Sequence, residues 1–158
     1  MFRVIVGKSV IELSLVVRVH IDCQFRKMHI SIALQCQLLN AIQDNDLELA
    51  EDLLRRDAVD PDTRFLLGSE NQVPAICLCV ERGLYEMAKL LVEYGCSINQ
   101  VDSCGYTPLH LASSHQFIDL VRLLIHHRAN VNAVSNYGHT PLHLAAQQSS
   151  VGNKHSIN

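Results

Sequence analysis

The chain has 158 residues, a formal net charge of −3 at neutral pH and only 18% charged residues. This length leaves room for one domain, and the basic residues do not gather into a stripe, which argues against a nucleic-acid-binding surface. The six cysteines have no framework-like spacing and the N-terminal region makes a poor signal peptide, so the composition also argues against a secreted disulfide-rich protein.

A reducing compartment fits these cysteines best, and we expect an intracellular protein of the cytoplasm or the nucleus. Lys8, Glu12 and Arg18 interrupt the apolar N-terminal stretch, which is too charged to span a bilayer. We therefore expect neither a membrane nor a nucleic acid among the partners.

Residues 1–34 have the periodicity of β-strands. From Ile11 to Ile21 every odd position is apolar, and among the even positions only Val16 breaks the alternation. Residues 3–6 and the turn at residues 7–9 can pair with this stretch as a hairpin, although an isolated hairpin is marginal in water. We expect an N-terminal extension that is either a β-hairpin or disordered.

The next segment predicts a first helical unit over about residues 35–68. Residues 38–42 and 47–54 have the apolar spacing of two helices. Acidic residues are frequent around this unit, and we interpret them as a solvated face, with a basic partner as the alternative. They are Asp44, Asp46, Glu48, Glu51, Asp52, Asp57, Asp60 and Asp62.

A long loop at residues 57–73 follows, marked by Pro61, Gly68 and Asn71. It is about five residues longer than the spacing of the later units allows, which predicts an excursion near residues 65–67. The excursion is either a docking feature or a plain bulge, and we favour the bulge.

A second unit is predicted over residues 69–101. Leu84, Met87, Ala88 and Leu91 follow an i, i+3, i+4, i+7 spacing, as on the buried face of a helix. The helix before it spans the apolar residues 74–79, where we interpret the two cysteines as core residues.

The two units that follow contain a repeated motif. Residues 107–112, Thr-Pro-Leu-His-Leu-Ala, return 33 positions later as residues 140–145. Thr107 and Thr140 suit a helix N-cap, and the proline after each suits the first helical position. A second helix follows the first motif, with apolar residues at positions 117, 120, 121 and 124.

The last unit is incomplete in sequence. Residues 149–158 have no apolar face able to form a second helix, so we expect a partial unit at 135–148 and a disordered tail. Each unit of a repeat stack buries its face on a neighbour. We therefore expect the helices at 117–127 and 141–148 to be left partly uncovered.

A 33-residue unit that opens with Thr-Pro-Leu-His-x-Ala resembles an ankyrin repeat, and the resemblance covers roughly residues 36–148. It implies an all-α fold, an ankyrin-repeat solenoid of about three and a half helix-turn-helix units at about 35–68, 69–101, 102–134 and 135–148. Gln116 and Arg128 stand where the family usually has glycine, which predicts local strain or a shifted loop. Ser135 replaces the aspartate that normally opens the turn.

The resemblance also implies a binding scaffold with a concave surface of turn tips and inner helices. Tyr106 and Tyr137 are the candidates for binding hot spots, because tyrosine combines a large apolar area with a polar tip. The alternative is that both merely fill tip positions. The matching positions here are Glu81, Arg82, Ser103, Cys104, Tyr106, Ser114, His115, Asn136, Tyr137, His139, Gln147 and Gln148.

Catalytic and metal-binding motifs find no support in the sequence. The Gly7-Lys8-Ser9 stretch ends like a phosphate loop, but Phe2 occupies the position of its first glycine. His110 and His143 are the motif histidines, and the resemblance implies that they are structural. We therefore expect no enzyme, no cofactor, no metal and no small-molecule substrate.

Three hypotheses follow. The first is an adaptor or scaffold that holds a protein partner, for example in a ubiquitin ligase or as an inhibitor of a transcription factor. The alternative is a truncated fragment of a larger ankyrin repeat protein without independent activity. The third is a metal or redox enzyme that uses the cysteines and the nine histidines.

Overall fold

The computed structural model describes residues 4–6, 9–11, 31–56, 58–66 and 72–152. At the N-terminus β1 (Val4–Val6) pairs antiparallel with β2 (Ser9–Ile11), and Val4 lies opposite Ile11. The partner of the first strand is thus the segment directly after the turn. The alternating stretch at residues 12–22, for which we predict a strand, lies outside the described residues, and the boundary at residue 34 stays a prediction.

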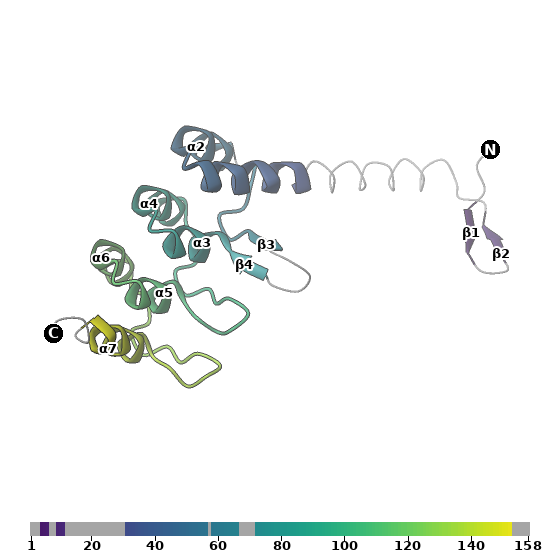
Figure 1. The fold of residues 1–158 in the computed structure, drawn as a ribbon. Coiled ribbons are helices and arrows are strands. Elements are labelled where there is room, and N and C mark those ends of the chain that lie inside the picture. The colour runs from purple at the N-terminus through teal and green to yellow at the C-terminus, as the bar shows by residue number, and fades with distance from the viewer. Residues whose placement is uncertain (1–3, 7–8, 12–30, 57, 67–71, 153–158) are drawn as a thin grey trace.

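The rest of the described chain is a stack of helix pairs (Figure 1). Residues 31–44 are helical and pair with α2 (Leu47–Arg55), α3 (Ala75–Glu81) pairs with α4 (Tyr85–Glu93), and α5 (Pro108–Ser114) pairs with α6 (Ile118–His126). The helix α7 (Pro141–Gly152) ends the stack. The helices α3, α5 and α7 contact one another in one row, and α2, α4 and α6 in another. The expected all-α solenoid is confirmed.

The repeated motif forms a helix cap. The Thr107 side chain accepts a hydrogen bond from the His110 backbone N–H, and the His110 side chain accepts one from the Thr107 backbone N–H over 3.1 Å. Pro108 occupies the first helical turn, where its missing N–H leaves no intrahelical bond unmade. The same threonine-histidine bond recurs from Thr140 to His143 over 3.2 Å. The motif therefore determines where α5 and α7 begin.

The long first loop forms a β-hairpin. β3 (Arg64–Leu66) pairs antiparallel with β4 (Gln72–Pro74), and Phe65 lies opposite Val73. Both of these side chains are buried in the core, whereas Leu66 is exposed. The expected excursion is thus a hairpin that packs into the core through Phe65 and Val73, and whether it is a docking feature or a plain bulge stays a prediction. The connection between the strands lies outside the described residues.

The structure decides between local strain and a shifted loop at Gln116 and Arg128. Gly83 and Gly95 adopt φ angles of 71° and 89°, and one repeat later Gln116 and Arg128 adopt 58° and 62°. The backbone therefore keeps the left-handed conformation although the residues that replace glycine carry side chains. This conformation is unfavourable for residues with a Cβ atom.

The end of the stack differs from the expected boundary at residue 148. Helix α7 continues to Gly152, so the prediction of a disordered tail from residue 149 is wrong for residues 149–152. The chain does not turn after Gln147 and Gln148, because glutamine is a good helix former and the helix continues through them. The expectation that the last helices are left partly uncovered is confirmed, because Ile118, Ile125 and Leu142 are exposed. None of the helices in the described ranges is long and apolar enough to cross a membrane.

The predicted core cysteines are confirmed as core. Cys77, Cys79 and Cys96 are buried, and Cys77 and Cys79 lie in α3, whose first six residues are all buried. Burial raises the pKa of all three thiols, that of Cys79 to about 12, so they stay protonated at neutral pH. Cys104 is half-buried and Cys36 is exposed.

Replacing either left-handed residue by glycine should stabilise the protein. We expect Gln116→Gly and Arg128→Gly each to raise the free energy of unfolding by about 0.5–1 kcal/mol. Glycine removes the backbone strain, and this gain exceeds the cost of the larger conformational entropy that glycine gives the unfolded chain. Urea denaturation measures the free energy of unfolding of each variant. Arg122→Gly, within α6, is the matched control and should lower stability by about 1 kcal/mol. Loss of stability in both left-handed variants would contradict the assignment.

Thiol reactivity should follow burial. In the native protein we expect a thiol-specific alkylating reagent to modify Cys36 and Cys104 within minutes and Cys77, Cys79 and Cys96 far more slowly, because a buried protonated thiol is a poor nucleophile. Peptide-resolved mass spectrometry measures each site, with guanidinium-unfolded protein as the control. Rapid native modification of Cys77 or Cys79 would show that α3 is not the centre of the core.

Candidate functional site

The turn before α5 is organised by the Asp102 side chain. Its Oδ1 atom accepts hydrogen bonds from the backbone N–H groups of Cys104 over 2.9 Å and Tyr106 over 2.8 Å. The Asp102 backbone N–H donates to the Tyr106 carbonyl, and Gly105 adopts a φ of 77° between them. These bonds fix the backbone that carries Cys104 and Tyr106, two of the predicted site residues.

The next turn repeats this arrangement with Ser135 in place of the aspartate. Its Oγ atom accepts from the backbone N–H groups of Tyr137 over 3.3 Å and His139 over 3.2 Å. These bonds are longer than those of Asp102, but they join the equivalent positions. The replacement of aspartate by serine therefore preserves the turn that carries Asn136, Tyr137 and His139.

The two turns are bonded directly to each other. The Asn136 backbone N–H donates to the Cys104 carbonyl over 3.1 Å, and its side-chain amide donates to the Ser103 carbonyl over 3.2 Å. A Cβ atom on Gly105 would lie 2.9 Å from the Asn136 backbone nitrogen, so only glycine allows this close approach. The two turns therefore form one continuous surface.

Aromatic rings gather on that surface. The ring centroids of Tyr106 and Tyr137 are 6.0 Å apart, and Tyr137 also lies 6.5 Å from the ring of His139. Tyr106 is 5.5 Å from the buried His110 ring beneath it. These separations are typical of interacting aromatic pairs. We call Cys104, Tyr106, Tyr137 and His139 the aromatic turn cluster.

Tyr137 is the most accessible ring of the cluster, with 64% of its surface exposed. Its hydroxyl donates to the Cys104 sulfur over 3.8 Å, and this hydrogen bond raises the pKa of Tyr137. The phenol therefore stays a neutral donor and acceptor at physiological pH. Tyr137 therefore exposes a large apolar ring with one polar end.

The remaining predicted site residues lie elsewhere. His115 stacks on Phe117 at the far end of α5, with a centroid separation of 5.4 Å. Arg82 donates to the Gln43 carbonyl over 3.3 Å and so contacts the first helix pair. The predicted set thus divides into a turn group and a helix-end group, separated by the length of α5. The helix-end group consists of Glu81 and Arg82 at the end of α3, Ser114 and His115 at the end of α5, and Gln147 and Gln148 at the equivalent positions, which lie within α7.

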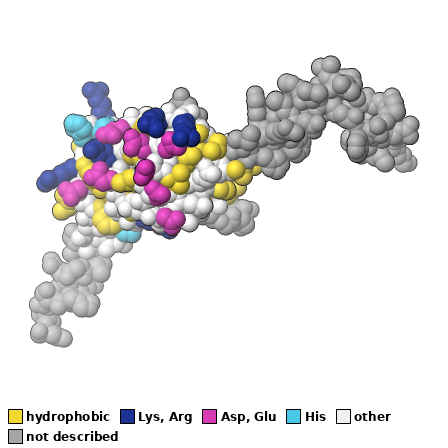
Figure 2. Space-filling view, turned by 90° about the horizontal axis from the view of Figure 1, so that it is seen from above, with side chains coloured by type: hydrophobic (Ala, Val, Ile, Leu, Met, Phe, Trp, Pro, Cys, Tyr) yellow, Lys and Arg dark blue, Asp and Glu magenta, His cyan; other side chains and the backbone are white. Residues whose placement is uncertain are grey.

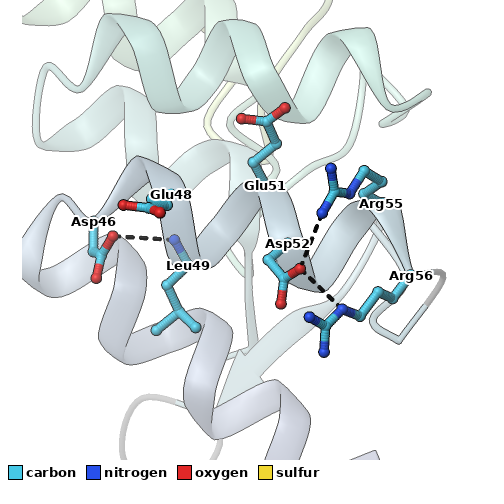
Figure 3. A pocket seen from close by; sticks show the side chains of 7 residues that line it. All are labelled: Asp46, Glu48, Leu49, Glu51, Asp52, Arg55 and Arg56. Carbon is cyan, nitrogen blue, oxygen red and sulfur yellow. Dashed lines mark hydrogen bonds and ion pairs between the residues drawn. The ribbon is translucent and has the colours of Figure 1, made fainter.

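The acidic helix α2 faces a hollow of about 570 Å³ (Figure 3). Asp46 caps the helix by accepting from the Leu49 backbone N–H over 3.1 Å, and Asp52 pairs with Arg55 at 3.4 Å and Arg56 at 2.9 Å. Figure 2 shows acidic and basic side chains intermixed on this side of the molecule. These local pairings favour the solvated face over an acidic site for a basic partner.

Asp62 has a role that the sequence did not indicate. Its Oδ1 atom accepts from the Ser97 backbone N–H and from the Gln100 side-chain amide, both over 2.6 Å. Asp62 is exposed, and it also joins the hairpin region to the turn of the next unit. In the sequence, only the position of Asp62 just before β3 indicates this role, and the unusual length of the loop obscures that position. Within the described ranges, no three His, Cys, Asp or Glu side chains group closely enough to hold a metal ion.

Comparisons with known proteins agree with this architecture. A relative from Mus musculus, protein phosphatase 1 regulatory subunit 27, is 38% identical over 82 residues, which cover 52% of this chain and 51% of the relative. The Homo sapiens protein of the same name is 37% identical over 82 residues, with the same coverage. The match thus spans about half the length of each relative.

A sequence model of the family described as ankyrin repeats, in three copies, matches residues 38–135 and 76–155. These ranges include residues 38–44 of the first helix and every later described helix, α7 included. The capped helices, the left-handed turns and this match together show that the chain belongs to the ankyrin repeat family.

Proposed function

We propose that the chain is a protein–protein interaction module that binds a protein partner through the aromatic turn cluster. Ankyrin repeats generally mediate protein–protein interactions, and both matched relatives bear the name of a regulatory subunit. The observation that carries the proposal is the pairing of Tyr106 with Tyr137 across two turns that hydrogen bonds hold together.

The physical reason is preorganisation. Binding orders side chains and loops, and that ordering opposes affinity. Here Asp102 and Ser135 already fix the backbone of both turns, and Asn136 connects them. Tyrosine also contributes a large contact area with few rotatable bonds, so the cluster has the properties of a binding anchor.

Protein phosphatase 1 is the first partner to test, because both matched relatives are named as its regulatory subunits. We propose a non-catalytic role in which the chain positions its partner, in the cytoplasm or the nucleus. The match covers about half of each relative, so the test must also allow for other partners. The competing hypothesis is a fragment that binds nothing on its own.

We expect Tyr137→Ala to weaken binding of the partner at least tenfold while stability changes by less than about 0.5 kcal/mol, because the ring is exposed. Tyr85→Ala is the matched control, since Tyr85 is a partly exposed tyrosine on α4, away from the turns. Both variants must first show wild-type helicity by circular dichroism.

Affinity measurements with purified protein phosphatase 1, together with quantitative capture from lysate, read out the effect. Partners that the wild type and Tyr85→Ala enrich and Tyr137→Ala loses support the turn cluster. If all three chains capture the same proteins, the assignment of the surface is wrong. Capture of chaperones alone favours the fragment hypothesis.

A further inference from the structure

The two turns of the aromatic turn cluster lie in segments of the chain that carry almost no charge. Asp102 is the sole Asp, Glu, Lys or Arg in residues 94–118, and residues 129–153 contain none of the four. Both turns project from the same side of the stack (Figure 1). The surface that Tyr106 and Tyr137 share therefore combines two aromatic rings with a single fixed charge, which is negative.

The Asp102 carboxylate has bonding capacity left. Its Oδ1 atom accepts both backbone hydrogen bonds of the turn, and no hydrogen bond to its Oδ2 atom is formed among the described residues. A carboxylate has about four acceptor sites on its two oxygens. Asp102 is also half-buried rather than enclosed. The carboxylate is therefore able to accept from a donor that a partner supplies.

The described part of the chain does not neutralise this charge. Arg64 of β3 approaches the same turn, but it donates to the Val101 carbonyl over 3.0 Å. Neither Arg64 nor any other basic side chain in the described ranges forms an ion pair with Asp102. The charge also acts on the exposed ring, because the hydrogen bond to Cys104 and then the charge of Asp102 both raise the pKa of Tyr137.

The two tyrosine rings are suited to a cation. The faces of aromatic rings are negative, and they attract a cation within about 6 Å of the ring centroid. The centroids of Tyr106 and Tyr137 are 6.0 Å apart and their planes are inclined by 32°. A single cation can therefore lie within that distance of both rings. Tyr137 is exposed and Tyr106 is half-buried, so the pair is open to a partner.

We propose that the Tyr106–Tyr137 pair and the Asp102 carboxylate bind an arginine side chain of the protein partner. The inference rests on the proposed function and adds a chemical specificity to its contact surface. Arginine fits better than lysine, because its planar guanidinium stacks on aromatic rings and its five N–H donors reach a carboxylate at the same time. An acidic side chain would meet the negative charge of Asp102 instead.

The probe is a single arginine residue blocked at both ends, N-acetyl-arginine N-methylamide, titrated into the full chain at low salt. The matched control ligand is the citrulline analogue, which has nearly the same shape and no charge. NMR of tyrosine-labelled protein reports binding through the ring resonances, which Tyr106→Phe and Tyr137→Phe assign. The rings of Tyr85 and Tyr94, at the two ends of α4, are the internal control.

We expect the arginine probe to shift the resonances of Tyr106 and Tyr137 and to bind at least fivefold more tightly than the citrulline analogue. Asp102→Asn should weaken arginine binding about threefold and leave citrulline binding unchanged. Asparagine keeps an oxygen that accepts from the turn and removes the charge alone. Ser135 already holds the second turn with a neutral oxygen, so the turn tolerates this change.

Ser135→Asp is a second variant, and its expected result is a gain of binding. It adds a carboxylate where Ser135 accepts from the backbone N–H groups of Tyr137 and His139. We expect this variant to bind the arginine probe about twofold to threefold more tightly and the citrulline analogue unchanged. Circular dichroism checks that both variants keep the helicity of the wild type.

Three results would overturn the proposal. The first is equal binding of the arginine and citrulline probes. The second is an arginine affinity that neither Asp102→Asn nor Ser135→Asp changes. The third is a set of shifts confined to Tyr85 and Tyr94.

The outcome for the partner separates this inference from the proposed function. If Tyr137→Ala loses a partner that Asp102→Asn binds as tightly as the wild type, the turn cluster is the contact and arginine is not its ligand. If the arginine probe shifts Tyr106 and Tyr137 but Tyr137→Ala loses no partner, the arginine site stands and the proposed function is wrong.

Discussion

The contact on which this architecture depends is the buried ring of His110. One ring nitrogen accepts from the Thr107 backbone N–H and caps α5, and the other lies 2.9 Å from the carbonyl of His139 in the next turn. Because Nδ1 accepts, Nε2 carries the proton and donates to that carbonyl. A fully buried neutral imidazole thus fixes the start of one helix and the position of the following turn together.

The arrangement of the proposed binding surface follows from this constraint. His139 accepts from His110 through its carbonyl, and its own N–H donates to Ser135, so the second turn is held from both sides. Asn136 then connects that turn to the first one, which brings the rings of Tyr106 and Tyr137 together. A partner that binds there would meet side chains whose backbone is already ordered, so the ordering cost of binding would be small.

Much of the fold could be predicted because the 33-residue spacing places caps and apolar faces at equivalent positions. The hairpin at Phe65 and Val73 was missed, since a short insertion gives too little alternation to indicate strands. The extension of α7 was missed too, because polar residues with good helix propensity give no apolar periodicity. The exposure of single site residues was predictable, but their division into two groups depends on turn geometry that spacing does not encode.

The proposed function rests on the turn cluster as the surface through which the chain contacts its partner. The most direct test replaces Tyr137 by the photo-crosslinking residue p-benzoylphenylalanine, with Tyr85 replaced in a matched chain. Binding through the turn cluster predicts discrete adducts with a partner protein from position 137 and none from position 85. Adducts from position 85 alone, or equal adducts from both positions, would contradict it.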